Sequence, residues 1–164
     1  MIEQLDRLPP HDLDSEKAVL GAMILKPTVA DEVGLNLTAD DFGGEALEGC
    51  NDHLVFTRPD VIQEIHASFL EVGCDVLETD TFRANRLAIS EYGLQDRVLE
   101  MNRTAARLAR EVADRFATPE QPRFVAGSIG PSGLLPSTSD PELGRITYEE
   151  LVEVYREQAL GLIQ

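Results

Sequence analysis

Four polar residues stand at the ends of two short apolar segments, where they could contact a small-molecule substrate. Glu78, Thr79 and Asp80 close the segment over 74–79, and Ser128 ends the segment over 124–128. Both segments have the length and apolar centre of buried strands in a parallel sheet. If the strands belong to a barrel, their C-terminal ends lie on its functional face. An ordinary pairing of Glu78 with a neighbouring arginine is an equally open interpretation.

The other reactive side chains form no recognisable metal or nucleotide site. Cys50 and Cys74 are the only cysteines, and they lack the spacing of a zinc site. The three histidines lie in separate segments, and the glycines between 127 and 133 fit neither nucleotide-binding fingerprint. We therefore predict no catalytic residue and no metal ligand in this chain.

The composition is that of an acidic globular protein of 164 residues, with a net charge of −16. Such a charge argues against a surface that binds the phosphate backbone of nucleic acid. No signal-peptide pattern opens the chain, and no apolar run approaches the length of a membrane span. We therefore expect a cytoplasmic protein with neither a nucleic-acid nor a membrane partner.

Helical and strand patterns alternate from residue 59 onward. Helical spacing predicts a helix over 59–72, begun by a capping box of Thr57 and Asp60 and ended by a left-handed Gly73. After the strand at 74–79 come a long amphipathic helix over 94–116, the strand at 124–128 and a loop rich in Gly, Pro and Ser. A capping box of Thr147 and Glu150 then opens a helix that reaches residue 162. We expect the two strands to be adjacent and parallel, joined by a right-handed crossover.

The second part of the chain carries the motifs Glu48-Gly49-Cys50-Asn51-Asp52, Thr57-Arg58-Pro59-Asp60-Val61-Ile62, Glu78-Thr79-Asp80-Thr81-Phe82, Ala84-Asn85-Arg86-Leu87-Ala88, Glu91-Tyr92-Gly93-Leu94 and Val125-Ala126-Gly127-Ser128-Ile129-Gly130-Pro131. Through these motifs the chain, from about residue 41 to the end, resembles the homocysteine-binding barrel of cobalamin-dependent methionine synthases, the homocysteine S-methyltransferase family. The resemblance implies an α/β fold, an incomplete (β/α)8 (TIM-type) barrel fragment preceded by a short helical segment.

The same resemblance implies homocysteine as the small-molecule substrate of the family. It places Glu78, Thr79, Asp80 and Ser128 at the barrel mouth as substrate-binding residues, although the family usually has Asn at position 80. The zinc ligands of the family are three cysteines on later strands. Zinc and cobalamin are therefore expected only in full-length members, and this chain alone is expected to be inactive.

Residues from about 5 to 42 carry a second resemblance. Asp14 is a plausible N-cap for a helix over 14–25, and Thr28 can cap another. The segment is similar to the start of the N-terminal domain of replicative DNA helicases, through Leu8-Pro9-Pro10-His11-Asp12-Leu13, Glu16, Ala18-Val19-Leu20-Gly21-Ala22-Met23 and Asp31-Glu32-Val33. We therefore divide the chain into a helical lead-in, 1–42, and a partial barrel, 43–164.

Three functions remain open at this point. The chain is a fragment of a methyltransferase, a protein-interaction module related to the helicase domain, or a fused or truncated reading frame without activity. A partial parallel sheet leaves two strand edges unpaired, so we also expect association with a completing partner or self-association. The charge of −16 opposes close packing between copies.

Overall fold

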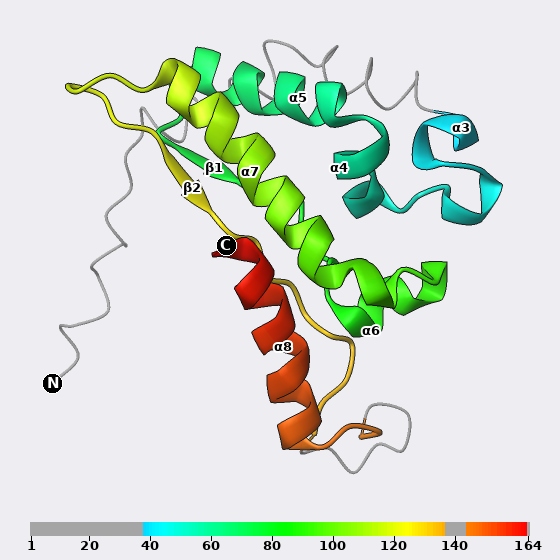
Figure 1. Ribbon diagram of the computed structural model, residues 1–164. Helices are drawn as coiled ribbons and strands as arrows, with labels where there is room; N and C mark the ends of the chain where they lie inside the picture. Colours follow the sequence, from blue (N-terminus) through cyan, green and yellow to red (C-terminus); the bar gives the residue numbers. More distant parts are fainter. Residues whose placement is uncertain (1–37, 137–143, 164) are drawn as a thin grey trace, which may run out of the picture.

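The computed structural model describes residues 38–136 and 144–163 (Figure 1). This part of the chain is mixed α/β, mostly helical, with a two-stranded parallel sheet. Its elements are α3 (Ala39–Phe42), the 3-10 helices η1 (Glu45–Leu47) and η2 (Asn51–His53), α4 (Leu54–Thr57), α5 (Pro59–Glu71), β1 (Val76–Glu78), α6 (Arg86–Ile89), η3 (Ser90–Tyr92), η4 (Gln95–Arg97), α7 (Val98–Phe116), β2 (Phe124–Ala126) and α8 (Tyr148–Leu162). None of these helices is long and apolar enough to cross a membrane.

The helices predicted over 14–25 and after Thr28 lie outside the described residues, as does nearly all of the helicase-like segment. The division of the chain at residue 42 therefore stays a prediction. Downstream, the predicted helices over 59–72, 94–116 and 147–162 are confirmed as α5, α7 and α8, although α7 begins only at Val98, after the 3-10 helix η4.

The two strands are parallel neighbours, as predicted, although each is shorter than predicted. Their register is Val76 opposite Phe124, Leu77 opposite Val125 and Glu78 opposite Ala126. The chain passes from β1 to β2 through α6 and α7, which makes this a β-α-β unit. The right-handed crossover stays a prediction.

Helices cover one face of the sheet. Leu77 of β1 packs with Leu70 of α5 and with Val112 and Ala113 of α7, and Val125 of β2 lies against the same cluster. In Figure 1, α7 runs beside both strands and α5 lies near their N-terminal ends. Burial of these apolar side chains holds the helical layer to the sheet.

The opposite face of the sheet is open to solvent. Val76 and Phe124, which face each other across the two strands, are 53% and 55% exposed, and Glu78 and Ala126 are also exposed. The prediction of fully buried strands is therefore wrong for both. Side chains alternate between the faces of a strand, and the described helices cover only the face of Leu77 and Val125. The predicted TIM-type barrel corresponds here to a small parallel sheet with helices on one side, and the described residues do not close a barrel.

A second apolar core joins the segment before α5 to the first half of α7. Its buried residues are Phe42, Leu54, Val55, Ile62, Ala84, Ile89, Val98, Met101, Ala105 and Leu108. This core fixes the turn between β1 and α6 against α7, because Ala84 and Ile89 lie within it. The polar strand ends are thus held between two packed clusters.

Local signals explain where two of the helices begin and end. Gly73, which follows α5, has φ +103°. Its N–H donates to the carbonyl of Leu70, and the N–H of Cys74 donates to the carbonyl of Phe69, which together form a Schellman motif. The Thr147–Glu150 capping box is present at the start of α8. The capping box predicted at Thr57 is wrong. Thr57 ends α4, and Arg58 binds Asp60 instead.

Helix α8 packs directly on α7 at Gly161. A Cβ atom at this position would lie 2.7 Å from Asn102 Cβ and 2.9 Å from the carbonyl oxygen of Leu99. The second of these is backbone, so the two helices would have to move apart. Gly161 is therefore required by the close approach of the helices.

We expect Gly161→Ala to lower the free energy of unfolding by up to about 2 kcal/mol. The steric cost of overpacking, about 1–3 kcal/mol, outweighs the gain of ~1 kcal/mol that alanine brings to a helix interior. Urea denaturation measures the change, with Glu153→Ala on the exposed face of α8 as the control. If Gly161→Ala is the more stable protein, α7 and α8 do not approach this closely.

Candidate functional site

The ends of the two strands are joined by a buried hydrogen-bond network. The hydroxyl of Thr79 accepts the backbone N–H of Ser128 at 2.9 Å and lies 2.7 Å from the hydroxyl of Thr81. The Thr81 hydroxyl in turn donates to the Ser128 carbonyl at 2.8 Å. Both threonines and Ser128 are buried. The structure thus brings together two of the predicted residues, Thr79 and Ser128, and adds Thr81.

The direction of each bond in this network follows from the number of hydrogens. The single hydroxyl hydrogen of Thr81 goes to the Ser128 carbonyl, so the Thr79 hydroxyl must be the donor between the two threonines. Thr79 therefore both accepts and donates within the network. Its hydroxyl is committed to holding the strand ends and is not left free for a ligand.

Glu78 lies on the open face and is joined to the network through Ser128. The Ser128 hydroxyl donates to Glu78 Oε1 at 2.5 Å. Among the described residues, the carboxylate of Glu78 contacts this hydroxyl rather than an arginine, which disfavours the ordinary ion pair. Because one carboxylate has several acceptor positions, Glu78 retains acceptor capacity toward the open face.

Asp80 follows the strand and is partly buried. Its Oδ2 atom is buried without a hydrogen-bond partner in the described structure. Burial, with a smaller contribution from the nearby Asp52 carboxylate, raises the pKa of Asp80 to about 7. Burial also raises the pKa of Asp52, whose Oδ1 accepts the backbone N–H of Arg83 at 3.2 Å. Asp80 and Asp52 are therefore neighbouring acids in a poorly solvated place.

Gln158 of α8 reaches the same strand ends and was not predicted. Its Nε2 atom donates to the Thr81 carbonyl at 2.8 Å and lies 3.5 Å from the Ser128 carbonyl. Its side chain is fully buried. The sequence does carry one signal for it, because Gln158 falls at helical spacing from Leu151 and Val154 on the buried side of α8.

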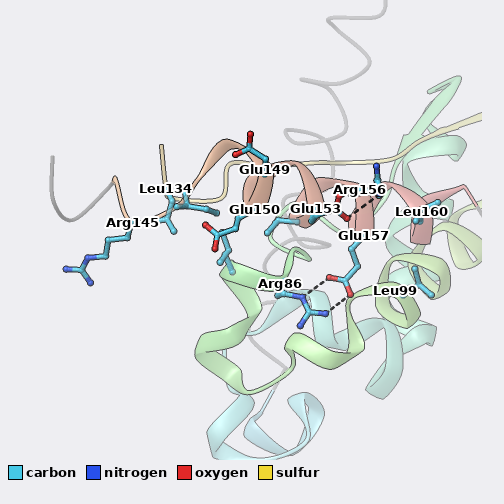
Figure 2. Close-up of a pocket in the computed structure, with 13 residues that line it drawn as sticks. Arg86, Leu99, Leu134, Arg145, Glu149, Glu150, Glu153, Arg156, Glu157 and Leu160 are labelled. Carbon is cyan, nitrogen blue, oxygen red and sulfur yellow. Dashed lines mark hydrogen bonds and ion pairs between the residues drawn. The ribbon is translucent and has the colours of Figure 1, made fainter. Parts of the chain in front are cut away.

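A separate hollow lies away from these residues. A groove of about 760 Å3 is lined by apolar residues such as Leu87, Leu99 and Leu134, and by charged residues of α8. Figure 2 shows Arg86 paired with Glu157, through two hydrogen bonds of 2.7 and 3.0 Å. None of the four predicted site residues lines it. We place the candidate site at the strand ends, because polar atoms from both strands converge there.

The cysteines do not form a metal centre with other described residues. Cys50 is buried, and burial raises the pKa of its thiol to about 11, so the thiolate that zinc needs is disfavoured. No group of three or more His, Cys, Asp or Glu side chains within 38–136 and 144–163 is arranged to hold a metal ion. The described residues therefore do not fit a zinc site.

Comparison with known proteins decides the family. The model of the homocysteine S-methyltransferase family matches residues 19–164. The chain belongs to the homocysteine S-methyltransferase family. It is 38% identical over 154 residues to the methionine synthase of Mycobacterium tuberculosis. The aligned region is 93% of this chain and 12% of that protein. It is also 41% identical over 127 residues to the methionine synthase of Mycobacterium leprae. That aligned region is 77% of this chain and 10% of the relative.

The matches also show how much of the relatives this chain represents and where the family resemblance begins. The chain spans about a tenth of the length of these two methionine synthases. The family match also begins at residue 19, well upstream of residue 41, where the sequence motifs placed the start of the resemblance. The helicase-like interpretation of residues 5–42 gains no support from these matches.

Proposed function

We propose that this chain supplies two adjacent strands of a homocysteine-binding (β/α)8 barrel of the methionine synthase type. The observation that carries the proposal is the hydrogen-bonded junction of the β1 and β2 ends, which projects Glu78 onto the uncovered face of the sheet. In parallel barrels the C-terminal ends of the strands form the active-site face. Family membership and the curated relatives support the choice of homocysteine as substrate.

In this proposal the four predicted residues have different roles. Glu78 accepts hydrogen bonds from the ammonium group of the amino acid, because it keeps a free carboxylate oxygen beside the open face. Thr79 and Ser128 are positioning residues, since their polar atoms are used in the network between the strands. Asp80 lies just after β1 beside these residues and, with its pKa raised to about 7, carries a proton below neutral pH.

We further propose that the isolated chain does not transfer a methyl group. The chemistry of the family needs a zinc-bound thiolate, and the described residues offer no ligand set for zinc. A closed barrel needs eight strands, whereas the described residues contribute two. Isothermal titration of the purified chain with homocysteine, with and without zinc, should give no saturable binding.

A chimera tests the role of Glu78. This chain replaces the matched 154 residues in the Mycobacterium tuberculosis methionine synthase, and methyl transfer to homocysteine is measured. We expect activity, and we expect Glu78→Gln to raise KM for homocysteine about 10- to 100-fold with a smaller effect on kcat, since a hydrogen bond to a charged group contributes about 1.5–3 kcal/mol.

The control for that experiment is Glu120→Gln, which removes a carboxylate from an exposed turn. It should leave KM unchanged. A folded chimera that binds zinc and yet has no activity, or a Glu78→Gln variant with the KM of the parent chimera, would refute the proposed site.

A further inference from the structure

Helix α8 reaches the segments that follow both strands through one line of side chains. Tyr155, Gln158 and Gly161 follow one another at intervals of three residues, so they lie along one side of the helix. Gly161 allows the close approach to α7, and the other two contact the loops after β1 and β2. In Figure 1 the C-terminal end of α8 lies close to the end of β2. We call Tyr155 and Gln158 the α8 pair.

The amide of Gln158 joins the two loops. Its Nε2 atom donates to the carbonyl of Thr81, after β1, at 2.8 Å, and it lies 3.5 Å from the carbonyl of Ser128, after β2. Carbonyl oxygens only accept hydrogen bonds, so the nitrogen of the amide has to face them and the orientation of the side chain is fixed. One buried group therefore holds two segments that are 47 positions apart in the sequence.

Neither carbonyl needs Gln158 in order to be hydrogen bonded. The Thr81 carbonyl also accepts the backbone N–H of Ala84 at 3.1 Å, and the Ser128 carbonyl also accepts the hydroxyl of Thr81 at 2.8 Å. Removal of the amide would therefore leave both acceptors with a donor, and the large cost of an unpaired buried group would not arise. What the amide adds is a common reference point for the two loops.

Tyr155 holds the loop after β2 from the side of α8. Its hydroxyl accepts the backbone N–H of Ser132 at 3.0 Å and donates to the carbonyl of Gly130 at 3.3 Å. The N–H of Gly130 in turn donates to the carbonyl of Phe82, in the loop after β1, at 3.0 Å. The loop after β2 is thus fixed between α8 and the loop after β1.

We propose that the α8 pair consists of positioning residues for the amino-acid site, which set the two strand-end loops in one arrangement and so fix the place of Glu78. The proposal rests on the proposed function, in which Glu78 binds the ammonium group. The link is Ser128, whose carbonyl lies beside the Gln158 amide and whose hydroxyl donates to Glu78 Oε1 at 2.5 Å. Movement of Ser128 would turn the carboxylate away from the amino acid. Neither Tyr155 nor Gln158 touches the substrate.

Hydrogen exchange of the isolated chain measures the arrangement of the loops. Gln158→Met keeps the length of the side chain and removes the amide. The N–H of Gly130, which joins the loops through Phe82, should exchange about five-fold faster, the factor that corresponds to one net hydrogen bond. The N–H of Leu70 in α5 should exchange as in the parent. The melting temperature should fall by no more than about 4 °C, because both carbonyls keep a donor.

Tyr155→Phe is the second variant, and it keeps the test decisive if Gln158→Met does not fold. It removes only the hydroxyl, so exchange at Ser132 should also become about five-fold faster. Tyr148→Phe is its control, at a position of α8 that is 68% exposed. Gln121→Met, in an exposed turn, is the control for Gln158→Met. Both controls should leave the exchange rates of the two loops unchanged.

The chimeric enzyme measures the effect on the site. Gln158→Met and Tyr155→Phe should each raise KM for homocysteine about five-fold, with a smaller effect on kcat, because they position the group that binds the amino-acid end. A purely structural role would lower the melting temperature and leave KM and kcat unchanged. That result would overturn the proposal, as would faster exchange at Gly130 with an unchanged KM or a raised KM with unchanged exchange.

The outcomes separate this proposal from the proposed function. If Glu78→Gln raises KM in an active chimera and the two α8 variants do not, the α8 pair is not a positioning pair and the proposed function stands. If the folded, zinc-bound chimera is inactive while Gly130 exchanges faster in both variants of the isolated chain, the proposed function is refuted. The α8 pair then still holds the two loops.

Discussion

Asp80→Asn should stabilise the protein at pH 8 by about 3 kcal/mol. Burial raises the pKa of Asp80 from 3.8 to about 7. Above neutral pH the folded protein therefore holds a charged carboxylate in a poorly solvated position, which lowers its stability. The full shift corresponds to ~4 kcal/mol, and we reduce this value because Asp80 is partly exposed. Asparagine carries no charge and supplies an N–H donor beside Asp52.

The pH dependence gives the sharper measurement. Between pH 3.8 and about 7 the folded protein keeps a proton on Asp80 that the unfolded chain has released, so the free energy of unfolding falls as pH rises. Above this window both states are ionised and the contribution is constant. Burial lowers the pKa of His66, which acts with the opposite sign, so only the difference between parent and variant isolates Asp80.

Urea denaturation at pH 5 and pH 8 provides the comparison. The gain from Asp80→Asn should be clearly larger at pH 8 than at pH 5, where only part of the effect has developed. Glu120→Gln, at an exposed turn, reports the effect of removing one negative charge from the acidic chain. An equal gain for both variants would mean that net charge, rather than the buried carboxyl, limits stability.

Thr79→Val should destabilise the protein by about 2–4 kcal/mol. The substitution conserves shape but removes the acceptor of the buried Ser128 N–H and the donor to Thr81. A buried donor left without a partner costs about 1–3 kcal/mol, and the loss of the second bond adds to this cost. The strand ends should separate, so the effect appears in both the urea midpoint and hydrogen exchange at Ser128.

Thr118→Val is the matched control for this substitution. Thr118 also accepts a backbone N–H through its hydroxyl, from Gln121 at 3.0 Å, but in an exposed turn. Water can replace that bond, so the loss should stay below about 1 kcal/mol. Thr79→Ser should recover most of the stability, because it keeps the hydroxyl. Equal losses for Thr79→Val and Thr118→Val would contradict the buried network.

The three longest helices of the described residues could be predicted from the sequence because their signals are local. The apolar spacing of α5, α7 and α8 and the left-handed Gly73 depend on residues a few positions apart. The capping box predicted at Thr57 is absent because Thr57 ends α4, where its hydroxyl donates to the His53 carbonyl, and Asp60 is bound by Arg58. Arg58, next in sequence, binds Asp41 from before α4 as well as Asp60 of α5.

The candidate site could be predicted only in outline. Glu78, Thr79, Asp80 and Ser128 were chosen because they follow apolar segments, and three of them, Glu78, Thr79 and Ser128, are joined by hydrogen bonds at the strand ends. Which of them are free for a ligand depends on the register of β1 and β2, which joins residues about fifty positions apart. The bond from Thr81 to Ser128 and the lack of a partner for Asp80 Oδ2 depend on packing between distant segments, which no short sequence motif encodes.

The contact between Gln158 and Thr81 has a consequence for the order of folding. It joins residues 77 positions apart in the sequence, and long-range contacts form late because a long loop must close first. On a ribosome, β1, α7 and β2 can pack before α8 has been synthesised. The strand ends are therefore complete only after α8 has packed against them, so they should become rigid later than the core between α5, β1 and α7.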